Sequence, residues 1–281
     1  MNKVRTIWNL SRAELLRLVR STKIIILALF VIFANIQIVT PLRALSASME
    51  NKLSVFEPFV AVGNSGIVVL ILPLFFLAMM ADFPREGESQ YFVQIRCSRR
   101  VWTAGQIVYA MESSAGLTIF VFAASALLSL DFISPGTAYS HAVTGYVAAF
   151  PERSGEYVVQ LISENLYNQI PLFTAVIHTA FLLALYFLML ALLLLVFSLA
   201  KRKTAGIFLD GILILAGTAT CAGRMAYMWV FPMAHTITWL HYTEYERYPV
   251  LPLFCSYLYF GIINTVLIIS AIVMGKRYNS I

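Results

Sequence analysis

Residues 173–199 read "FTAVIHTAFLLALYFLMLALLLLVFSL", a stretch without a single Asp, Glu, Lys or Arg. A helix needs about 20 consecutive, mainly apolar residues to cross a hydrocarbon core of roughly 30 Å, so this stretch is long enough to span a membrane. The whole chain is similar in character, because 60% of its 281 residues are hydrophobic and only 12% are charged. Its mean hydropathy is +0.79. These values exclude an ordinary soluble domain and predict an integral membrane protein.

Comparable apolar stretches recur along the chain, separated by Gly, Pro and clusters of charged residues. The sequence therefore predicts an all-α polytopic membrane protein, with one transmembrane domain over residues 1–281 and six transmembrane helices. The predicted spans are 24–42, 59–81, 103–130, 173–199, 206–231 and 252–274. Residues 3–22 are predicted to form an amphipathic helix along the inner membrane surface, either as a functional element or as a basic topology anchor.

The distribution of Lys and Arg predicts the orientation, because basic loops are retained on the cytoplasmic side. With six spans, one side receives Lys3, Arg5, Arg12, Arg17, Arg20, Lys23, Arg85, Arg96, Arg99, Arg100, Lys201, Arg202, Lys203, Lys276 and Arg277. The other side receives Arg43, Lys52, Arg153 and Arg247 together with Glu50, Glu57, Asp131, Glu152, Glu156, Glu164, Glu244 and Glu246. Both termini are therefore predicted to be cytoplasmic. The net charge of +6 follows from this asymmetry, and no nucleic acid partner is expected.

Three cysteines, Cys97, Cys221 and Cys255, lie far apart and without the spacing of a metal site or a disulfide framework. No metal is expected, and the cysteines are interpreted as packing residues. The "ALSAS" sequence at 44–48 resembles a signal-peptidase site, but the preceding apolar run is long for a signal core, so retention of the first span is expected.

Two segments on the predicted outer side differ from ordinary short connections. Residues 131–172 form a loop of roughly forty residues in which 156–167 could be a short helix, and a loop of that length usually packs as a cap or contributes to function. Residues 235–249 are rich in Tyr and Trp, which predicts an interfacial helix or hairpin.

A polar stretch, "DFPREGESQYFVQIRCSRRVW" at 82–102, interrupts the apolar chain on the predicted cytoplasmic side. A short amphipathic helix over about 85–98 would place Tyr91, Phe92 and Ile95 on one side, with Arg99 and Arg100 at its end. Apolar residues in a cytoplasmic loop are expected to be shielded from water. They would pack either against the cytoplasmic face of the same protein or in the cleft of a partner that accepts a short helix.

This stretch resembles the corresponding region of ABC-2 type transporter permeases. Members of that family show an acidic residue at the end of span two, a glycine, a short amphipathic helix, and then Ser-Arg and Gly-Lys at the start of span three. This chain matches with Asp82, Gly87, the helix around Tyr91 to Ile95, Ser98-Arg99 and Gly105-Gln106. Gln106 in place of the lysine, and the long loop 131–172, are departures from the pattern and indicate a divergent branch.

The resemblance implies a bacterial cell-membrane exporter in which the helix at 85–98 is a coupling helix that docks in an ATPase subunit. The implied coupling residues are Glu86, Gly87, Tyr91, Phe92, Ile95, Arg99 and Arg100. Two ATPase subunits and a second permease chain, identical or similar, are the implied partners besides membrane lipids. The chain contains no GxxxxGK[ST] phosphate-binding loop, so ATP and Mg²⁺ are expected on the ATPase and no cofactor on this chain.

Several charged residues are predicted inside or at the ends of spans, where a charge is costly. Asp82 and Asp210 would lie near inner ends and be reached by water, whereas Arg224 would lie in the outer half of span five. Glu112 would lie near the midplane, either on the translocation pathway or hydrogen-bonded to Ser113 and Ser114 as interhelical glue. Glu112, Arg224 and Asp210 are the candidate pathway residues, and a Glu112–Arg224 pair is conceivable.

Two other classes of function compete with an ATP-driven exporter. Gly63, Gly66 and Pro73 in span two hint at the broken helices of an ion-coupled secondary transporter, although no second half mirrors them. An intramembrane enzyme is disfavoured, because neither HExxH nor GxSxG occurs. For an exporter of this class, a peptide, antimicrobial or drug-like cargo is the preferred expectation.

Overall fold

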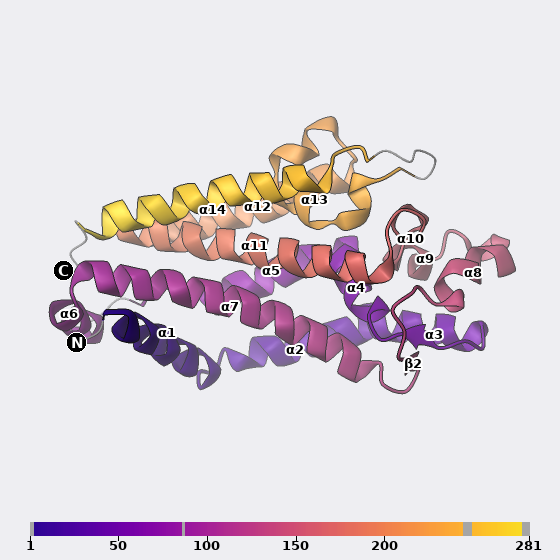
Figure 1. Cartoon of the computed structure of the whole chain (residues 1–281), viewed down its shortest axis with the longest axis horizontal. Coiled ribbons are helices and arrows are strands. Elements are labelled where there is room, and N and C mark those ends of the chain that lie inside the picture. The colour runs from indigo at the N-terminus through magenta and orange to yellow at the C-terminus, as the bar shows by residue number, and fades with distance from the viewer. Residues whose placement is uncertain (1–2, 86–87, 244–248, 277–281) are drawn as a thin grey trace.

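The computed structural model describes residues 3–85, 88–243 and 249–276, and it is almost wholly helical (Figure 1). Within these residues, five helical segments are long and apolar enough to cross a membrane, or six if a sharply bent pair of helices counts as one span. The five are Ile24–Ser48, Arg99–Leu128, Leu172–Leu199, Lys203–Ala222 and Leu253–Gly275. The prediction of an all-α membrane protein is confirmed at this level.

The first segment is one continuous helix of three parts, α2 (Ile24–Ala34), the π-helical turn η1 (Asn35–Val39) and α3 (Thr40–Ser48). It extends beyond the predicted end at residue 42. The π segment ends two residues before Pro41, whose ring nitrogen cannot donate a helical hydrogen bond. The backbone N–H and the hydroxyl of Thr40 both donate to the carbonyl of Asn35, the hydroxyl at 2.9 Å. The helix continues past the proline to Ser48.

The predicted span at 59–81 is broken. Helix α4 (Glu57–Asn64) and helix α5 (Gly66–Met80) meet at an angle of 80° at Ser65, whose backbone is extended. Asn64, at the buried break, has partners: the indole Nε1 of Trp239 donates to its carbonyl, and the backbone N–H of Trp239 donates to its side-chain oxygen. All of α4 is buried, so the break folds it into the protein.

Helix α11 (Leu172–Leu199) is the centre of the bundle. It contacts α4, α5, α14 (Leu253–Gly275), α12 (Lys203–Ala222) and α7 (Arg99–Leu128). The predicted bounds of α7, α11 and α14 differ from the observed ones by a few residues at most. The predicted span at 206–231 is wrong in its second half, because α12 ends at Ala222 and residues Ala226–Val230 form the short 3₁₀ helix η3.

The loop at 131–172 is a folded cap at one end of the bundle (Figure 1). Its elements are β2 (Ile133–Ser134), α8 (His141–Ala149), η2 (Pro151–Arg153), α9 (Tyr157–Leu161) and α10 (Glu164–Tyr167), so the expected helix at 156–167 is two short ones. Strand β1 (Leu53–Ser54) pairs in parallel with β2. The buried carboxylate of Glu57 accepts hydrogen bonds from the N–H groups of Ser54 and Ser140 at 2.7 and 2.6 Å, which fastens the cap to α4.

The segment after η3 packs beside the cap as α13 (Pro232–Thr236) and η4 (Thr238–His241). Ser256 of α14 lies between His235 and His241, 2.8 and 3.3 Å from their ring nitrogens. This contact ties the segment to α14. Residues 235–241 are thus largely helical, as one of the two expected forms of the 235–249 segment, and they are mostly buried; residues 244–248 lie outside the described part of the chain.

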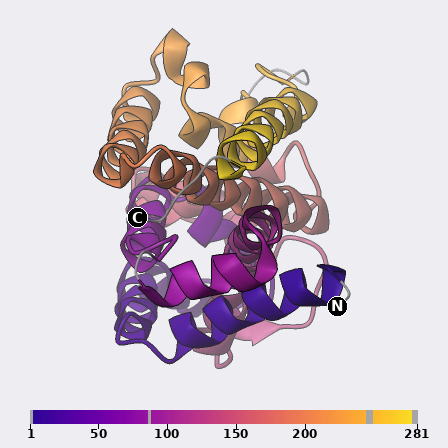
Figure 2. The same cartoon turned by 90° about the vertical axis from the view of Figure 1, so that its left-hand side faces the viewer.

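The opposite end of the bundle, called the basic end below, carries the start of α1 (Lys3–Val19), helix α6 (Glu88–Cys97) and the end of α14 (Figure 1). Figure 2 looks along the bundle from this end and shows α1 and α6 lying across it. Helix α1 packs against α7. A side chain on Gly105 of α7 would begin 3.1 Å from Leu10, so the small glycine permits the close approach.

The contact between α4 and α11 predicts a sensitive position at Gly63. A methyl group there would overlap Thr179, whose hydroxyl is held by Asn64 and Thr238. We expect Gly63→Ala to lower stability by about 1–3 kcal/mol, as overpacking does. In contrast, Gly66→Ala, which meets no atom within 4 Å, should be nearly neutral. Thermal unfolding in detergent checks both, and equal melting temperatures for the two variants would contradict this packing.

Candidate functional site

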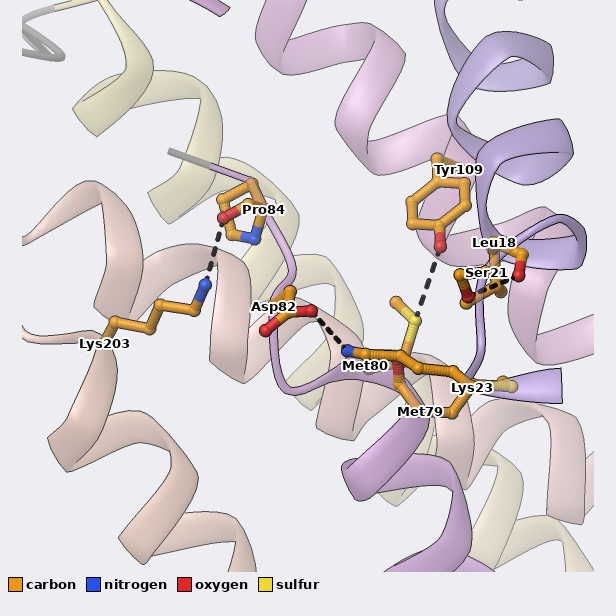
Figure 3. A network of polar contacts seen from close by, with 9 residues as sticks. All are labelled: Leu18, Ser21, Lys23, Met79, Met80, Asp82, Pro84, Tyr109 and Lys203. Atoms are coloured by element: carbon orange, nitrogen blue, oxygen red, sulfur yellow. Dashed lines mark hydrogen bonds and ion pairs between the residues drawn. The ribbon is translucent and has the colours of Figure 1, made fainter. Parts of the chain in front are cut away.

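The loop that leads into α6 is fastened from two sides (Figure 3). Lys23 forms an ion pair with Asp82 at 2.7 Å and also donates to the carbonyl of Met79 at 3.2 Å. Lys203 donates to the carbonyl of Pro84 at 3.2 Å. We call this set of contacts the joint.

The joint connects three parts of the chain that are far apart in sequence. Lys23 directly precedes α2, Asp82 and Pro84 follow α5, and Lys203 is the first residue of α12. Nearby, the hydroxyl of Tyr109 in α7 lies 3.8 Å from the sulfur of Met80 (Figure 3). The loop before α6 is therefore bound to the starts of both α2 and α12.

The electrostatics of the joint favour an ionised Asp82. The hydrogen bond from Lys23 is the main cause that lowers the pKa of this carboxyl below its ordinary value of 3.8, and the charges of Lys203 and Arg85 act in the same direction. Its side chain is 66% exposed, which confirms the expected contact with water. Screening by water and salt limits the strength of such a pair.

Helix α6 is shorter than the predicted 85–98 and begins at Glu88. Gln94 is buried and Val93 half-buried against the bundle, whereas Phe92 is 60% exposed. Ser98, in a left-handed conformation with φ of 67°, separates α6 from α7. Two predicted coupling residues, Glu86 and Gly87, lie outside the described residues, and so do the side chains of Tyr91 and Ile95.

Arg99 and Arg100 form the first turn of α7 and are exposed. The N-terminus of a helix carries a partial positive charge, so cations in this position disfavour the helix slightly. Their placement is thus not explained by helix stability. It suits contact with anionic groups beyond the basic end, either acidic side chains or lipid phosphates.

Glu112 is held by α1 and not by its neighbours. Ser11, which is fully buried, donates its hydroxyl hydrogen bond to the Glu112 carboxylate. Ser113 and Ser114 donate to carbonyls of their own helix, so the expected bond between these serines and Glu112 is wrong. The carboxylate joins α1 to α7, in agreement with the interhelical role that the sequence left open.

Asp210 and Arg224 differ from expectation. Asp210 is fully buried, and neither carboxylate oxygen has a hydrogen-bond partner among the described residues, so the predicted access to water is wrong. Asp210 lies on the side of α12 that faces the bundle. The expected depth of a residue in the membrane does not predict which side of the helix it occupies. Arg224 follows the end of α12 and lies over the indole of Trp239 at 5.8 Å. No ion pair among the described residues joins Glu112 to Arg224.

The sequence predicted α6 but not the contacts of Lys23 and Lys203 that hold the loop before it. Lys23 and Asp82 are the first charged residues next to two apolar stretches, and Lys203 is the last base before a third. Their positions at span ends were a usable signal, because neighbouring spans bring such residues to one level of the membrane. A scan of protein families, a search of curated proteins and a search of solved structures each gave no match to the chain.

The Lys23–Asp82 pair predicts a pH-dependent stability term. The carboxyl has a lower pKa in the folded chain, so its contribution is full above the unfolded value and is lost as the pH falls below 3.8 through the folded value. We expect Asp82→Asn to cost less than about 1 kcal/mol near pH 7, as exposed pairs do. Thermal unfolding of Asp82→Asn, Lys23→Gln and the double variant measures the coupling, and strictly additive effects at neutral pH would contradict the pair.

The Ser11–Glu112 contact predicts different effects for two substitutions. Glu112→Gln keeps an acceptor for the Ser11 hydroxyl and should preserve stability. Glu112→Ala leaves that buried hydroxyl without its partner and should cost about 1–3 kcal/mol. Ser113→Ala, which removes only a bond within α7, is the matched control. Melting temperatures that rank Glu112→Gln with Glu112→Ala would show that Ser11 does not hold the carboxyl group.

Proposed function

We propose that this chain is the membrane-spanning permease subunit of an ATP-driven exporter of the ABC-2 type. The observation that carries the proposal is the joint at the basic end. A separate helix, α6, lies across that end, and the loop before it is bound by Lys23 and Lys203 to the starts of α2 and α12. In this arrangement, a displacement of α6 by a partner would move the spans that begin at α2 and α12.

Two further features support the proposal. The exposed Phe92 on α6 and the arginine pair at the start of α7 offer an apolar and a basic contact to a partner. The chain contains no phosphate-binding loop of its own, so chemical energy has to arrive through another polypeptide.

In this proposal the bent α4–α5 pair counts as the second of six spans, α1 is the elbow helix and α6 is the coupling helix. The basic end is cytoplasmic in a bacterial cell membrane, with both termini on that side. Two permease chains and two ATPase subunits make the transporter, and ATP with Mg²⁺ is bound by the ATPases. A peptide, antimicrobial or drug-like cargo moves outward.

An ion-coupled secondary transporter is the second candidate, and two observations favour it. The α4–α5 break at Ser65 interrupts a membrane segment, as discontinuous helices do around ion sites. Asp210 is a buried carboxyl group without a hydrogen-bond partner among the described residues, which is a default candidate for a functional group inside a membrane.

Purification of the intact complex from native membranes separates the two candidates. We expect ATP hydrolysis to co-purify with the chain, together with a polypeptide that has a phosphate-binding loop. Phe92→Ala combined with Arg99→Gln and Arg100→Gln should lower the co-purified activity about tenfold, by loss of apolar and charged contacts at one interface. The matched control is Arg43→Gln, which removes an exposed arginine at the opposite end of the bundle.

If no ATPase is retained by the wild-type chain, and the α6 variants export as well as the wild type, the proposal fails. Transport that persists without ATP, collapses with the proton gradient and is lost in Asp210→Asn would establish the second candidate instead.

A further inference from the structure

Two adjoining cavities lie at the cap end of the bundle, where the cap meets the segment after α12. Their volumes are about 290 and 390 Å³, and Asn165, Arg224 and Trp239 line both. The first is otherwise largely apolar, with Met228, Leu240 and Val250 among its walls. The second adds polar groups, including Ser163 and Glu164. Both cavities are open to the surface, and together they form one hollow of the size that holds a small ligand.

Arg224 occupies a left-handed backbone position beside this hollow. The N–H groups of Arg224 and Met225 bond to the carbonyls of Cys221 and Thr220, which is the hydrogen-bond pattern that commonly ends a helix with a left-handed residue. Glycine is usual at that position, yet here the left-handed residue, with φ of 45°, is Arg224, and Gly223 lies one place earlier. A long side chain in this conformation is disfavoured relative to glycine, and Glu50 and Lys201 adopt it with the same hydrogen-bond pattern at two other helix ends.

The guanidinium is also held in place. It lies 5.8 Å from the centre of the Trp239 ring, and that ring is fixed by its hydrogen bond to the Asn64 carbonyl at 3.0 Å. No carboxylate among the described residues is within ion-pair distance of Arg224. In the same hollow, the buried hydroxyl of Ser163 has no hydrogen-bond partner among the described residues. The hollow therefore presents a positioned cation, while the Ser163 hydroxyl lies beneath its wall.

The depth of Arg224 matches the headgroup layer of a membrane. Helix α12 has 20 residues, and at about 1.5 Å per residue it is as long as the hydrocarbon core is thick. If α12 crosses the membrane upright, Lys203 at one end and Arg224 beyond the other would lie at the two headgroup layers. Beside Arg224, the exposed side chains of Met225, Tyr227 and Val230 form an apolar surface on a turn that projects sideways from the bundle (Figure 1).

From these observations we propose that the Arg224 hollow binds the phosphate of a membrane phospholipid, from the leaflet at the cap end. The guanidinium donates two parallel hydrogen bonds to phosphate oxygens, as arginine does to phosphates in general. The acyl chains lie along the apolar turn of Met225, Tyr227 and Val230. The site is independent of the energy source for transport, so it stands whether or not an ATPase drives the chain.

The test uses the full chain in detergent, titrated with dioleoyl phosphatidylglycerol while its melting temperature is followed, and native mass spectrometry to count retained lipids. The wild type should be stabilised and should retain one more lipid than Arg224→Gln, whose apparent affinity should be about tenfold weaker. Arg224→Gly supplies the residue that the left-handed conformation favours. It should melt no lower than the wild type without lipid, yet lose the same affinity. Arg153→Gln, at an exposed arginine of the cap, is the matched control and should bind like the wild type.

Inorganic phosphate distinguishes the lipid from a free anion. At millimolar concentration it should leave the melting temperature unchanged, because it lacks acyl chains for the apolar turn. An arginine-dependent shift with phosphate alone, equal to that with the lipid, would overturn the assignment to a lipid. Equal lipid retention and affinity in the wild type, Arg224→Gln and Arg224→Gly would overturn the site itself.

Discussion

The rest of this structure depends on one constraint: inside a membrane, backbone polar groups must find partners within the protein. Where the chain stays helical the requirement is met locally, as in α11 and α14. At Ser65 the helix breaks, and the carbonyl of Asn64 is served from the far side of the bundle by the indole of Trp239. The Ser65 hydroxyl meets the hydroxyl of Tyr157 in the cap at 3.0 Å. The break is thus possible only because the cap and the segment after α12 pack over it.

The cost of burying polar groups in a membrane also limits where charged side chains lie. Two ion pairs join residues that are far apart in sequence, Lys23 with Asp82 at the basic end and Arg43 with Asp131 at the cap end. The joint thus connects the loop before α6 with the starts of α2 and α12. The cap end differs, because there the chain is shaped by short helices and by the buried carboxylate of Glu57.

The sequence predicted the long apolar helices. It did not predict features that depend on contacts between residues far apart in the chain. The spans at α11 and α14 were predicted almost to the residue, since charged or turn-forming residues mark their ends. Gly63 and Gly66 hinted at a broken helix, but the sequence did not give the position or the angle of the break at Ser65, because its hydrogen-bond partners come from distant residues. The end of α12 was missed because apolar residues continue past Arg224 as far as Phe231. At the candidate site, α6 and its arginines were found. The Ser11–Glu112 contact joins residues 101 positions apart, and the burial of Asp210 depends on which side of α12 faces the bundle, so neither could be predicted from one sequence.

The central claim is that a separate ATPase acts on this chain through α6. It is tested most directly by a photoreactive phenylalanine analogue placed at Phe92 in the full chain and activated in living cells. We predict one major adduct at position 92, with a protein that binds ATP. The same analogue at Phe208, on the exposed membrane face of α12, should give adducts with lipid only. A position-92 adduct with lipid alone, or with a protein on the other side of the membrane, would contradict the account.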